Sequence, residues 1–123
     1  RLEDMMLMYA ELLVEEGKIM EAVAYVNDIR KRAGCDEVNT VSAADALKLI
    51  KRERRIELMG EGVRWFDLVR WGEWQTEIQS LFDSYHNPDG TDKNNVQTGR
   101  YLYPIPLNQL NVTPGLYKQN EGY

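Results

Sequence analysis

Two glutamates near the middle of the chain, Glu57 and Glu61, have the residue type that glycoside hydrolysis needs in a pair of acid–base catalysts. Three arginines surround them, at Arg54, Arg55 and Arg64. A run of large aromatic residues follows, whereas glycosidase carboxylates require an open cleft for the sugar. These neighbours favour a structural salt-bridge network over catalysis, and we predict that the chain has no catalytic residues.

Charges of alternating sign continue at three-residue spacing, so that each can reach the next along a helix. The members of this ladder are Glu61, Arg64, Asp67 and Arg70. Large apolar residues are interleaved with them, namely Trp65, Phe66, Leu68, Val69 and Trp71. A segment that is apolar on several sides is not a simple surface helix, so we expect part of the ladder to be buried. A buried charge that loses its partner costs about 3–5 kcal/mol. A buried ladder therefore specifies one packing arrangement more than it adds stability.

Helices must position these charges. Ser42, followed three residues later by Asp45, predicts a capped helix start, and the helix should run from Ala43 to about Met59. Gly60 and Gly62 interrupt the pattern, a second helix is predicted over residues 63–71, and Gly72 ends it. A further short helix is predicted over residues 74–82.

Before these helices, two apolar stripes of helical spacing predict a helical hairpin in residues 1–34. Gly17 and Gly34 stand where the two helices should end. The small residues Ala10, Ala22 and Ala24 would let the helices approach closely. The hairpin resembles a tetratricopeptide-type repeat, but only one copy is present, and solenoids need about three stacked units.

The segment 83–123 is rich in loop signals. Asn87-Pro88-Asp89-Gly90 predicts a turn. Tyr101-Leu102-Tyr103-Pro104-Ile105-Pro106 must be extended, because residues before proline avoid the helical region. Pro106 should open a helical turn through Leu110, and Thr113-Pro114-Gly115 predicts a type II turn. No clear strand pair is visible. The fold class is therefore mainly α, with a tetratricopeptide-like hairpin packed on further helices and an irregular C-terminal segment.

Length and composition predict one domain and argue against several classes of partner and site. The 123 residues fit one domain, 1–123, made of a hairpin (1–34), helices (42–82) and a loop and extended segment (83–123). The formal net charge of −5 argues against a nucleic-acid partner. The longest apolar run, Met5–Ala10, has six residues, far short of the roughly 20 that span a membrane. One cysteine and one histidine exclude a Cys/His zinc site, and no cofactor or metal is predicted. A lone cysteine such as Cys35 is usually a small buried hydrophobe.

Four segments resemble the SusD/RagB family, in the same order and spacing. The opening hairpin, which closes with residues 27–34, is similar to the last helical repeat ahead of the signature region. Residues 50–58 (IKRERRIEL), Glu61-Gly62 and residues 64–72 (RWFDLVRWG) resemble the signature helices. Residues 101–106 (YLYPIP) resemble the second hallmark. Residues 119–123 (QNEGY) resemble the ending, with Glu121 where a proline is usual.

This resemblance implies a glycan-binding lipoprotein on the outer membrane of a Gram-negative bacterium. Such proteins are not enzymes and act as a lid on a TonB-dependent transporter of the SusC type. The chain would be the C-terminal scaffold part, with the lipid anchor upstream. Because it begins with Arg1 and no export signal follows, we expect that a leader was removed or that this is the tail of a longer protein.

The matched motifs then have an architectural role, carried by Arg54, Glu57, Glu61, Gly62, Arg64, Trp65, Asp67, Arg70, Trp71, Tyr101, Pro104 and Pro106. The ligand-contacting residues are not identified. Trp71, Trp74 and Tyr85 are candidates, although a tryptophan at a helix end more often packs in a core. Four tyrosines of the last 23 residues, namely Tyr101, Tyr103, Tyr117 and Tyr123, are expected to lie on the helices.

A different function remains open: a helical-repeat module that binds another protein in a hairpin groove. The first 34 residues favour it, although a single hairpin makes little groove. A lipoprotein signal with an anchor cysteine upstream would exclude this alternative.

Overall fold

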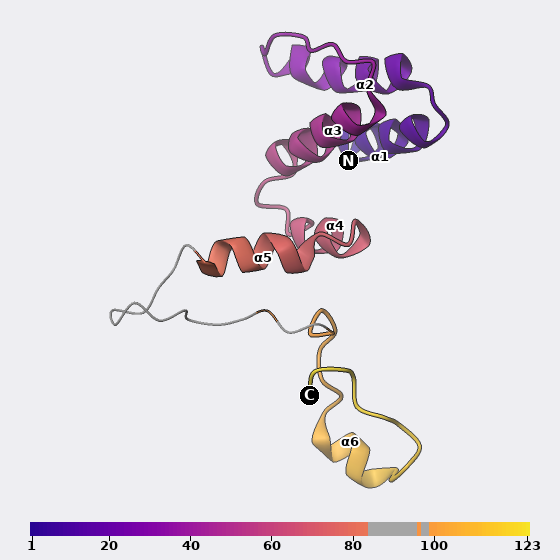
Figure 1. Ribbon diagram of the computed structural model, residues 1–123, viewed down its shortest axis with the longest axis vertical. Coiled ribbons are helices and arrows are strands. Elements are labelled where there is room, and N and C mark those ends of the chain that lie inside the picture. Colours follow the sequence, from indigo (N-terminus) through magenta and orange to yellow (C-terminus); the bar gives the residue numbers. More distant parts are fainter. Residues whose placement is uncertain (84–95, 97–98) are drawn as a thin grey trace. The chain divides into compact units, whose positions relative to one another are not determined.

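Helices form where the apolar spacing predicts them in the computed structural model, which describes residues 1–83, 96 and 99–123 (Figure 1). Within these residues every regular element is a helix, so the mainly α fold class is confirmed. The contacts group the chain into unit 1, residues 1–64, and unit 2, residues 65–123. A single domain over residues 1–123 stays a prediction.

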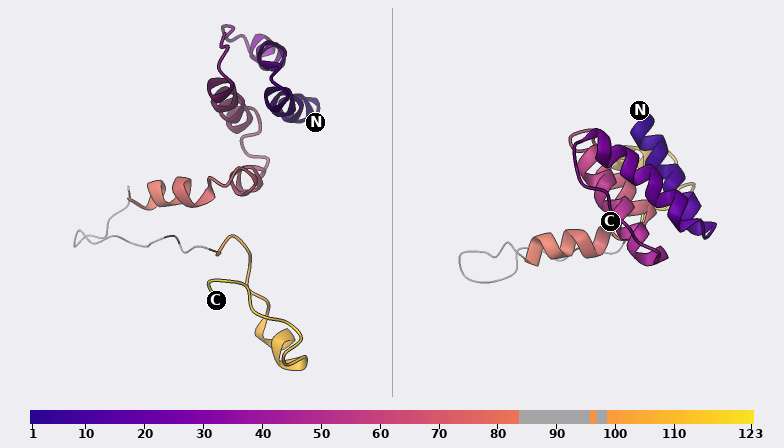
Figure 2. Two further views of the ribbon diagram at one scale, coloured as in Figure 1. Left: turned by 45° about the vertical axis from the view of Figure 1, so that its right-hand side comes forward. Right: turned by 90° about the horizontal axis from the view of Figure 1, so that it is seen from above.

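Unit 1 contains the predicted hairpin, α1 (Leu2–Glu15) and α2 (Ile19–Arg32), with α3 (Ala43–Glu57) packed against both helices (Figures 1 and 2). Its core joins the buried faces of the three helices, formed by Leu7, Ala10, Leu13, Val14, Ala22, Val23, Val26, Ile29, Ala46 and Ile50. Ala10 and Ala22 are fully buried, as close helix approach requires. The prediction was wrong for Ala24, which is exposed because it lies off the buried stripe of α2.

Glycine ends the first helix by a specific local geometry. Gly17 has φ +76°, which other residues rarely adopt. Its N–H donates to the Val14 carbonyl at 3.0 Å, and the next N–H, of Lys18, donates to the Leu13 carbonyl at 2.8 Å. This pair of bonds is the Schellman motif, and it recurs at Gly34 and Gly72. The predicted helix ends at these three glycines are therefore confirmed.

Unit 2 contains α4 (Arg64–Arg70, of which Arg64 belongs to unit 1), α5 (Trp74–Asp83) and α6 (Leu107–Val112). Residues 101–106 are not helical, and Pro106 is the N-cap of α6, as expected. The type II turn is confirmed by Gly115, whose φ is +81°, and by the Leu116 N–H, which donates to the Thr113 carbonyl at 3.2 Å.

Side-chain amides hold the C-terminal tail to the extended segment. The Gln119 amide oxygen accepts the Ile105 N–H at 2.8 Å, and its amide nitrogen donates to the Ile105 carbonyl at 3.0 Å. Asn120 donates to the Tyr103 carbonyl at 2.6 Å. One glutamine thus provides both hydrogen bonds that a neighbouring strand residue would provide, and it ties residues 119–120 to residues 103–105.

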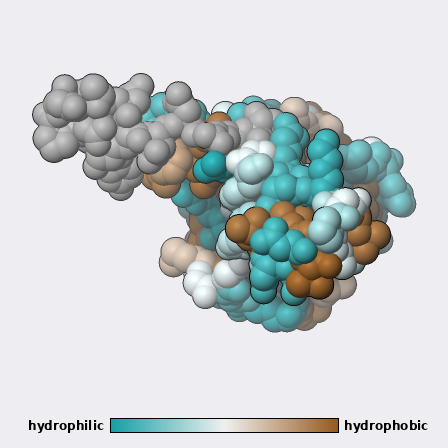
Figure 3. Space-filling model, turned by 90° about the horizontal axis from the view of Figure 1, so that it is seen from below, coloured by the Kyte–Doolittle hydropathy of each residue, from teal (hydrophilic) through white to brown (hydrophobic). Residues whose placement is uncertain are grey.

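Several apolar side chains are more exposed than the sequence suggests, and brown apolar residues lie among hydrophilic ones on the face drawn in Figure 3. Phe66 of α4 is 71% exposed, and Cys35, expected to be buried, is exposed in the link after α2.

The predicted turn at residues 87–90 and the candidate Tyr85 lie outside the described residues. No helix in the described ranges is long and apolar enough to cross a membrane.

Candidate functional site

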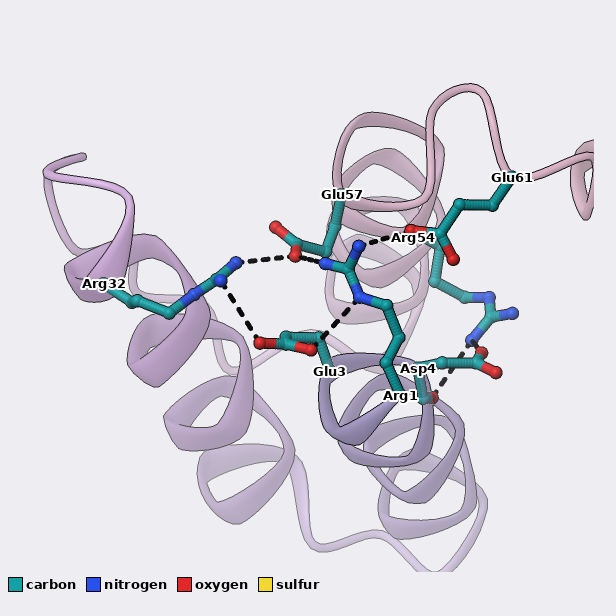
Figure 4. Close-up of polar contacts among 7 residues, drawn as sticks. All are labelled: Arg1, Glu3, Asp4, Arg32, Arg54, Glu57 and Glu61. Atoms are coloured by element: carbon teal, nitrogen blue, oxygen red, sulfur yellow. Dashed lines mark hydrogen bonds and ion pairs between the residues drawn. The ribbon is translucent and has the colours of Figure 1, made fainter.

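The ends of the three helices of unit 1 meet in a closed ring of ion pairs (Figure 4). We call it the ionic ring; its members are Arg1, Glu3, Arg32 and Glu57. Glu3 is 3.1 Å from Arg1 and 3.2 Å from Arg32. Glu57 accepts from Arg32 at 2.6 Å and from Arg1. Each charged group therefore has two partners of opposite charge. This arrangement is typical of ion pairs that hold helices together and not of a catalytic site.

The ring joins the start of α1, the last turn of α2 and the last residue of α3. Arg32 sits at a helix C-terminus, where the helix dipole favours a cation. Glu61 is connected to the ring through Arg1, so both carboxylates of the sequence-predicted pair contact the same guanidinium. The pair is thereby engaged in holding the helices together.

Glu3 shows the electrostatic effect of this position. The pKa of Glu3 lies below its usual value, first because a backbone N–H hydrogen-bonds to its carboxylate. Partial burial opposes this shift, while the hydrogen bond from Arg1 and the positive charges of Arg32 and Arg1 add to it. The ring thus favours the ionised carboxylate.

Arg54 lies beside the ring and is 3% exposed. Its guanidinium donates to the Asp4 carboxylate at 2.8 Å and to the Asp4 carbonyl at 3.3 Å, and it lies 3.8 Å from Glu11 (Figure 4 shows the Asp4 contact). Asp4 and Glu11 are both on α1, so Arg54 fastens α3 to α1. The preceding residue, Glu53, accepts from Arg30 of α2 at 2.5 Å.

The predicted charge ladder is divided between the two units. Glu61 precedes α4, which begins at Arg64, and its contact is with Arg1. Gly62 has φ +75° in the connection between α3 and α4. Within α4, Arg70 donates to Asp67 at 2.9 Å, and the Asp67 side chain is buried. The buried part of the ladder is therefore Asp67.

The aromatic candidates of unit 2, Trp71 and Trp74, each pack against other side chains of that unit. The Trp65 and Trp74 rings meet edge-to-face at 5.9 Å, and the Trp74 and Tyr101 rings are 6.0 Å apart. The Arg70 guanidinium covers the Trp71 ring at 4.7 Å. Trp71 and Trp74 thus both have protein neighbours on their rings.

A pocket of about 280 Å³ opens next to this cluster. We call it the C-terminal aromatic pocket; it is lined by Trp65, Arg100, Tyr101, Leu102, Tyr103 and Tyr123. The Arg100 guanidinium lies 5.0 Å from the centre of the Tyr123 ring, and its Nε donates to the Gly122 carbonyl at 3.0 Å. Of the four tyrosines expected to lie on the helices, Tyr101 contacts the Trp74 ring of α5, whereas Tyr103 and Tyr117 are exposed. Side-chain amides of residues 119–120 hold the tail to residues 103–105 instead.

The sequence pointed to the glutamates and to Arg54 but not to their partners. Apart from the neighbouring pair Arg1 and Glu3, the partners lie far apart in the sequence: Arg1 is 56 residues from Glu57 and 60 from Glu61, and Arg32 is 25 residues from Glu57. No local spacing signals such a contact. For the pocket, the signal was the number of tyrosines near the C-terminus, which did not indicate that Arg100 and Trp65 would join them.

Comparison with known proteins identifies the family. The family model described as the SusD family matches residues 1–123. Two similar proteins of Formosa agariphila are SusD-like protein P25, 33% identical over the whole chain, and SusD-like protein P2, 31% identical over the whole chain. The chain spans 24% and 25% of their lengths, that is, about a quarter.

Solved structures agree. A SusD superfamily protein from Bacteroides vulgatus aligns with all of this chain at a TM-score of 0.79 and 26% identity, over 27% of its own length. A SusD-like protein from Bacteroides fragilis aligns at a TM-score of 0.74 and 26% identity, over 25% of its length. With the family model matched from end to end, the chain belongs to the SusD family.

Proposed function

We propose that the protein carrying this chain binds glycans or oligosaccharides at the surface of the outer membrane of a Gram-negative bacterium. It passes them to a TonB-dependent, SusC-like transporter for uptake. The observation that carries this proposal is the match of the SusD family model to residues 1–123. Membership of this family favours a surface lipoprotein whose lipid anchor lies outside these residues.

Within that protein, we assign this chain the role of a C-terminal scaffold without catalysis. Three observations support the assignment: the ionic ring engages Glu57, Arg54 is buried against Asp4, and the Trp65 ring packs against the Trp74 ring. Each of these motif residues is used to join segments of the chain. The single-domain organisation and the structural role of the motif residues are part of this proposal.

The test of glycan binding is titration calorimetry of a polysaccharide panel against the full-length protein and against residues 1–123, side by side. We expect the full-length protein to bind at least one polysaccharide with micromolar affinity or better. Absence of heat with every polysaccharide, from a full-length protein whose folding is verified by circular dichroism, would overturn the proposal.

The transporter is tested separately, by purifying the full-length protein under mild detergent from the membranes that contain it. We expect a TonB-dependent outer-membrane protein to co-purify in stoichiometric amount. Recovery of the full-length protein alone, with its lipid anchor intact, would count against a permanent partner.

Catalysis is tested with Glu57→Gln and Glu61→Gln. We expect wild type and both variants to release no reducing sugar from any polysaccharide that the wild type binds. We also expect Glu57→Gln to lower the unfolding temperature, because Arg1 and Arg32 lose a charged partner. Hydrolysis by the wild type that both variants lack would instead identify a glycosidase.

One observation favours a second function, a helical-repeat module that binds another protein. The outer side of α1 exposes Leu2, Met5 and Leu12, which follow helical spacing. Such a stripe is typical of surfaces that contact protein. Further helical repeats upstream, with no lipoprotein signal, would favour this function over glycan uptake.

A further inference from the structure

We propose that the C-terminal aromatic pocket is a subsite for one pyranose ring of the glycan, with Tyr103 as its stacking platform and Arg100 as a donor to sugar hydroxyls. This inference rests on the proposed function, because it presumes that the protein binds glycans. It adds a binding site in unit 2, in a chain otherwise assigned to scaffold.

Three segments line the pocket, namely α4 through Trp65, residues 100–103 and the C-terminal tail, and the last two are fastened to each other. Gln119 and Asn120 bind the backbone of Ile105 and Tyr103, and Arg100 binds the Gly122 carbonyl. A Cβ atom at position 99 would lie 2.8 Å from the Cβ of Glu121, so only glycine permits this approach. The backbone at Tyr103 is therefore held by contacts that do not involve its ring.

The pocket offers the two kinds of surface that a sugar ring needs. The C–H faces of a pyranose are apolar and pack on flat aromatic rings, while its hydroxyls need hydrogen-bonding partners. Tyr103 is 89% exposed, so its ring is free to receive a face of the sugar. The Tyr123 ring is half exposed and is held beneath the guanidinium of Arg100.

Arg100 supplies the hydrogen-bond donors. Its Nε is engaged by Gly122, and a guanidinium carries five N–H groups in all. Within the part of the chain that the structure describes, the contacts of Arg100 are Gly122 and the Tyr123 ring. The terminal nitrogens of this exposed side chain remain available to hydroxyls or to a uronate carboxylate.

The volume sets the size of the ligand. Pockets for drug-sized molecules run from roughly 300 to 1,000 Å³, and this pocket holds about 280 Å³. It therefore suits a single sugar ring, either a chain end or one unit of a glycan that continues over the surface. Binding there would strengthen the affinity of a longer glycan that also contacts a main site elsewhere in the protein.

The experiment measures the affinity of the full-length protein for neutral hexasaccharides of glucose, mannose and xylose and for a galacturonate hexasaccharide, by titration calorimetry. Wild type is compared with Tyr103→Ala, Tyr103→Phe and the control Tyr117→Ala, which removes an exposed tyrosine outside the pocket. Because Tyr103 projects into solvent, its removal should leave the unfolding temperature unchanged, which is verified first.

We expect Tyr103→Ala to weaken the affinity roughly fivefold, whereas Tyr103→Phe, which keeps the ring, and Tyr117→Ala keep the wild-type value. Equal affinities of Tyr103→Ala and wild type for every bound glycan would overturn the subsite and leave the proposed function standing. So would an equal loss in Tyr117→Ala. If wild type binds no glycan, the proposed function fails first and the subsite fails with it.

Discussion

Arg54 illustrates at the residue scale how a buried charge becomes part of a scaffold. It is 3% exposed and lies between Asp4 and Glu11 of α1. A buried ion pair contributes little net stability compared with apolar packing, but removing one partner leaves the other charge without compensation. Such a residue therefore specifies how α3 sits on α1.

Replacing Arg54 by methionine should lower the free energy of unfolding by about 3 kcal/mol, because Asp4 and Glu11 lose their buried cation. Arg55→Met, one position along the same helix and exposed, should change it by no more than about 0.5 kcal/mol. Urea unfolding followed by circular dichroism measures both. Equal effects of the two substitutions would show that the buried contacts carry no special energy.

The depressed pKa of Glu3 predicts a pH dependence of stability. A carboxyl group whose folded pKa is below its unfolded value of 4.5 stabilises the fold above pH 4.5. This contribution is lost as the pH falls through the folded pKa. We therefore expect the unfolding temperature of wild type to fall more steeply below pH 4.5 than that of Glu3→Gln.

The control is Glu15→Gln, which removes an exposed glutamate at the other end of α1. Its unfolding temperature should follow the wild-type curve in the same pH series. If Glu3→Gln also follows that curve, the backbone hydrogen bond and the arginines of the ionic ring do not hold the Glu3 carboxylate in its charged form.

At the element scale, the ends of helices are specified by single residues. The start of α3 depends on Ser42, whose hydroxyl accepts the Asp45 N–H at 3.3 Å. This bond satisfies one of the first backbone donors of the helix, which have no partner within it. The C-terminal ends of α1, α2 and α4 depend on a glycine in the left-handed conformation.

Ser42→Ala should destabilise unit 1 by about 1 kcal/mol, the usual value of an N-cap hydrogen bond. Ser42→Asn, whose side-chain oxygen can make the same bond, should retain nearly all of the wild-type stability. Chemical denaturation of the two variants distinguishes capping from any general effect of substitution at this site. A loss of equal size in Ser42→Asn would contradict the role of the cap.

At the scale of the whole molecule, α1 buries apolar side chains on one side and exposes others to solvent. One side of this helix packs in the core through Leu7, Ala10 and Leu13. The opposite side exposes Leu2 at 70%, Met5 at 58% and Leu12 at 60%. Apolar side chains that are contiguous on a surface favour association with other protein.

We therefore expect residues 1–123, produced alone, to self-associate, with an apparent mass that rises with concentration in static light scattering. Met5→Glu combined with Leu12→Glu should shift this rise to higher concentration. The control is Val41→Glu combined with Met59→Glu, which removes exposed apolar side chains that lie off α1. A constant monomer mass for the unsubstituted chain would contradict this expectation.

The helices themselves were largely predictable from local sequence. Apolar spacing predicted α1, α2 and α3, and the glycines and Ser42 predicted their ends to within two residues. These signals are reliable because backbone caps and amphipathic faces act over one or two helical turns. Ala24 was misjudged, because burial depends on what packs against a helix and not on the residues of the helix alone.

The candidate site was predictable only in part. The alternating charges around Glu57 and Glu61 pointed to a salt-bridge network, and the structure has them in ion pairs with Arg1. Glu61 does not share a helix with the rest of the ladder, because α4 begins only at Arg64, whereas Arg70 and Asp67 form an ion pair three residues apart in α4. For the pocket, the tyrosines near the C-terminus were a signal, but they did not indicate that Arg100 and Trp65 would line it with them.

The sequence by itself determined the helices, their ends and the family, because these depend on residues close to one another or on motifs in a given order. Only the tertiary structure decided which charges meet and which tyrosines face solvent. Arg1 reaches Glu57 because the start of α1 and the end of α3 lie side by side, and Tyr103 is exposed because the tail binds its backbone. Contacts between distant residues follow from packing, which no local spacing specifies.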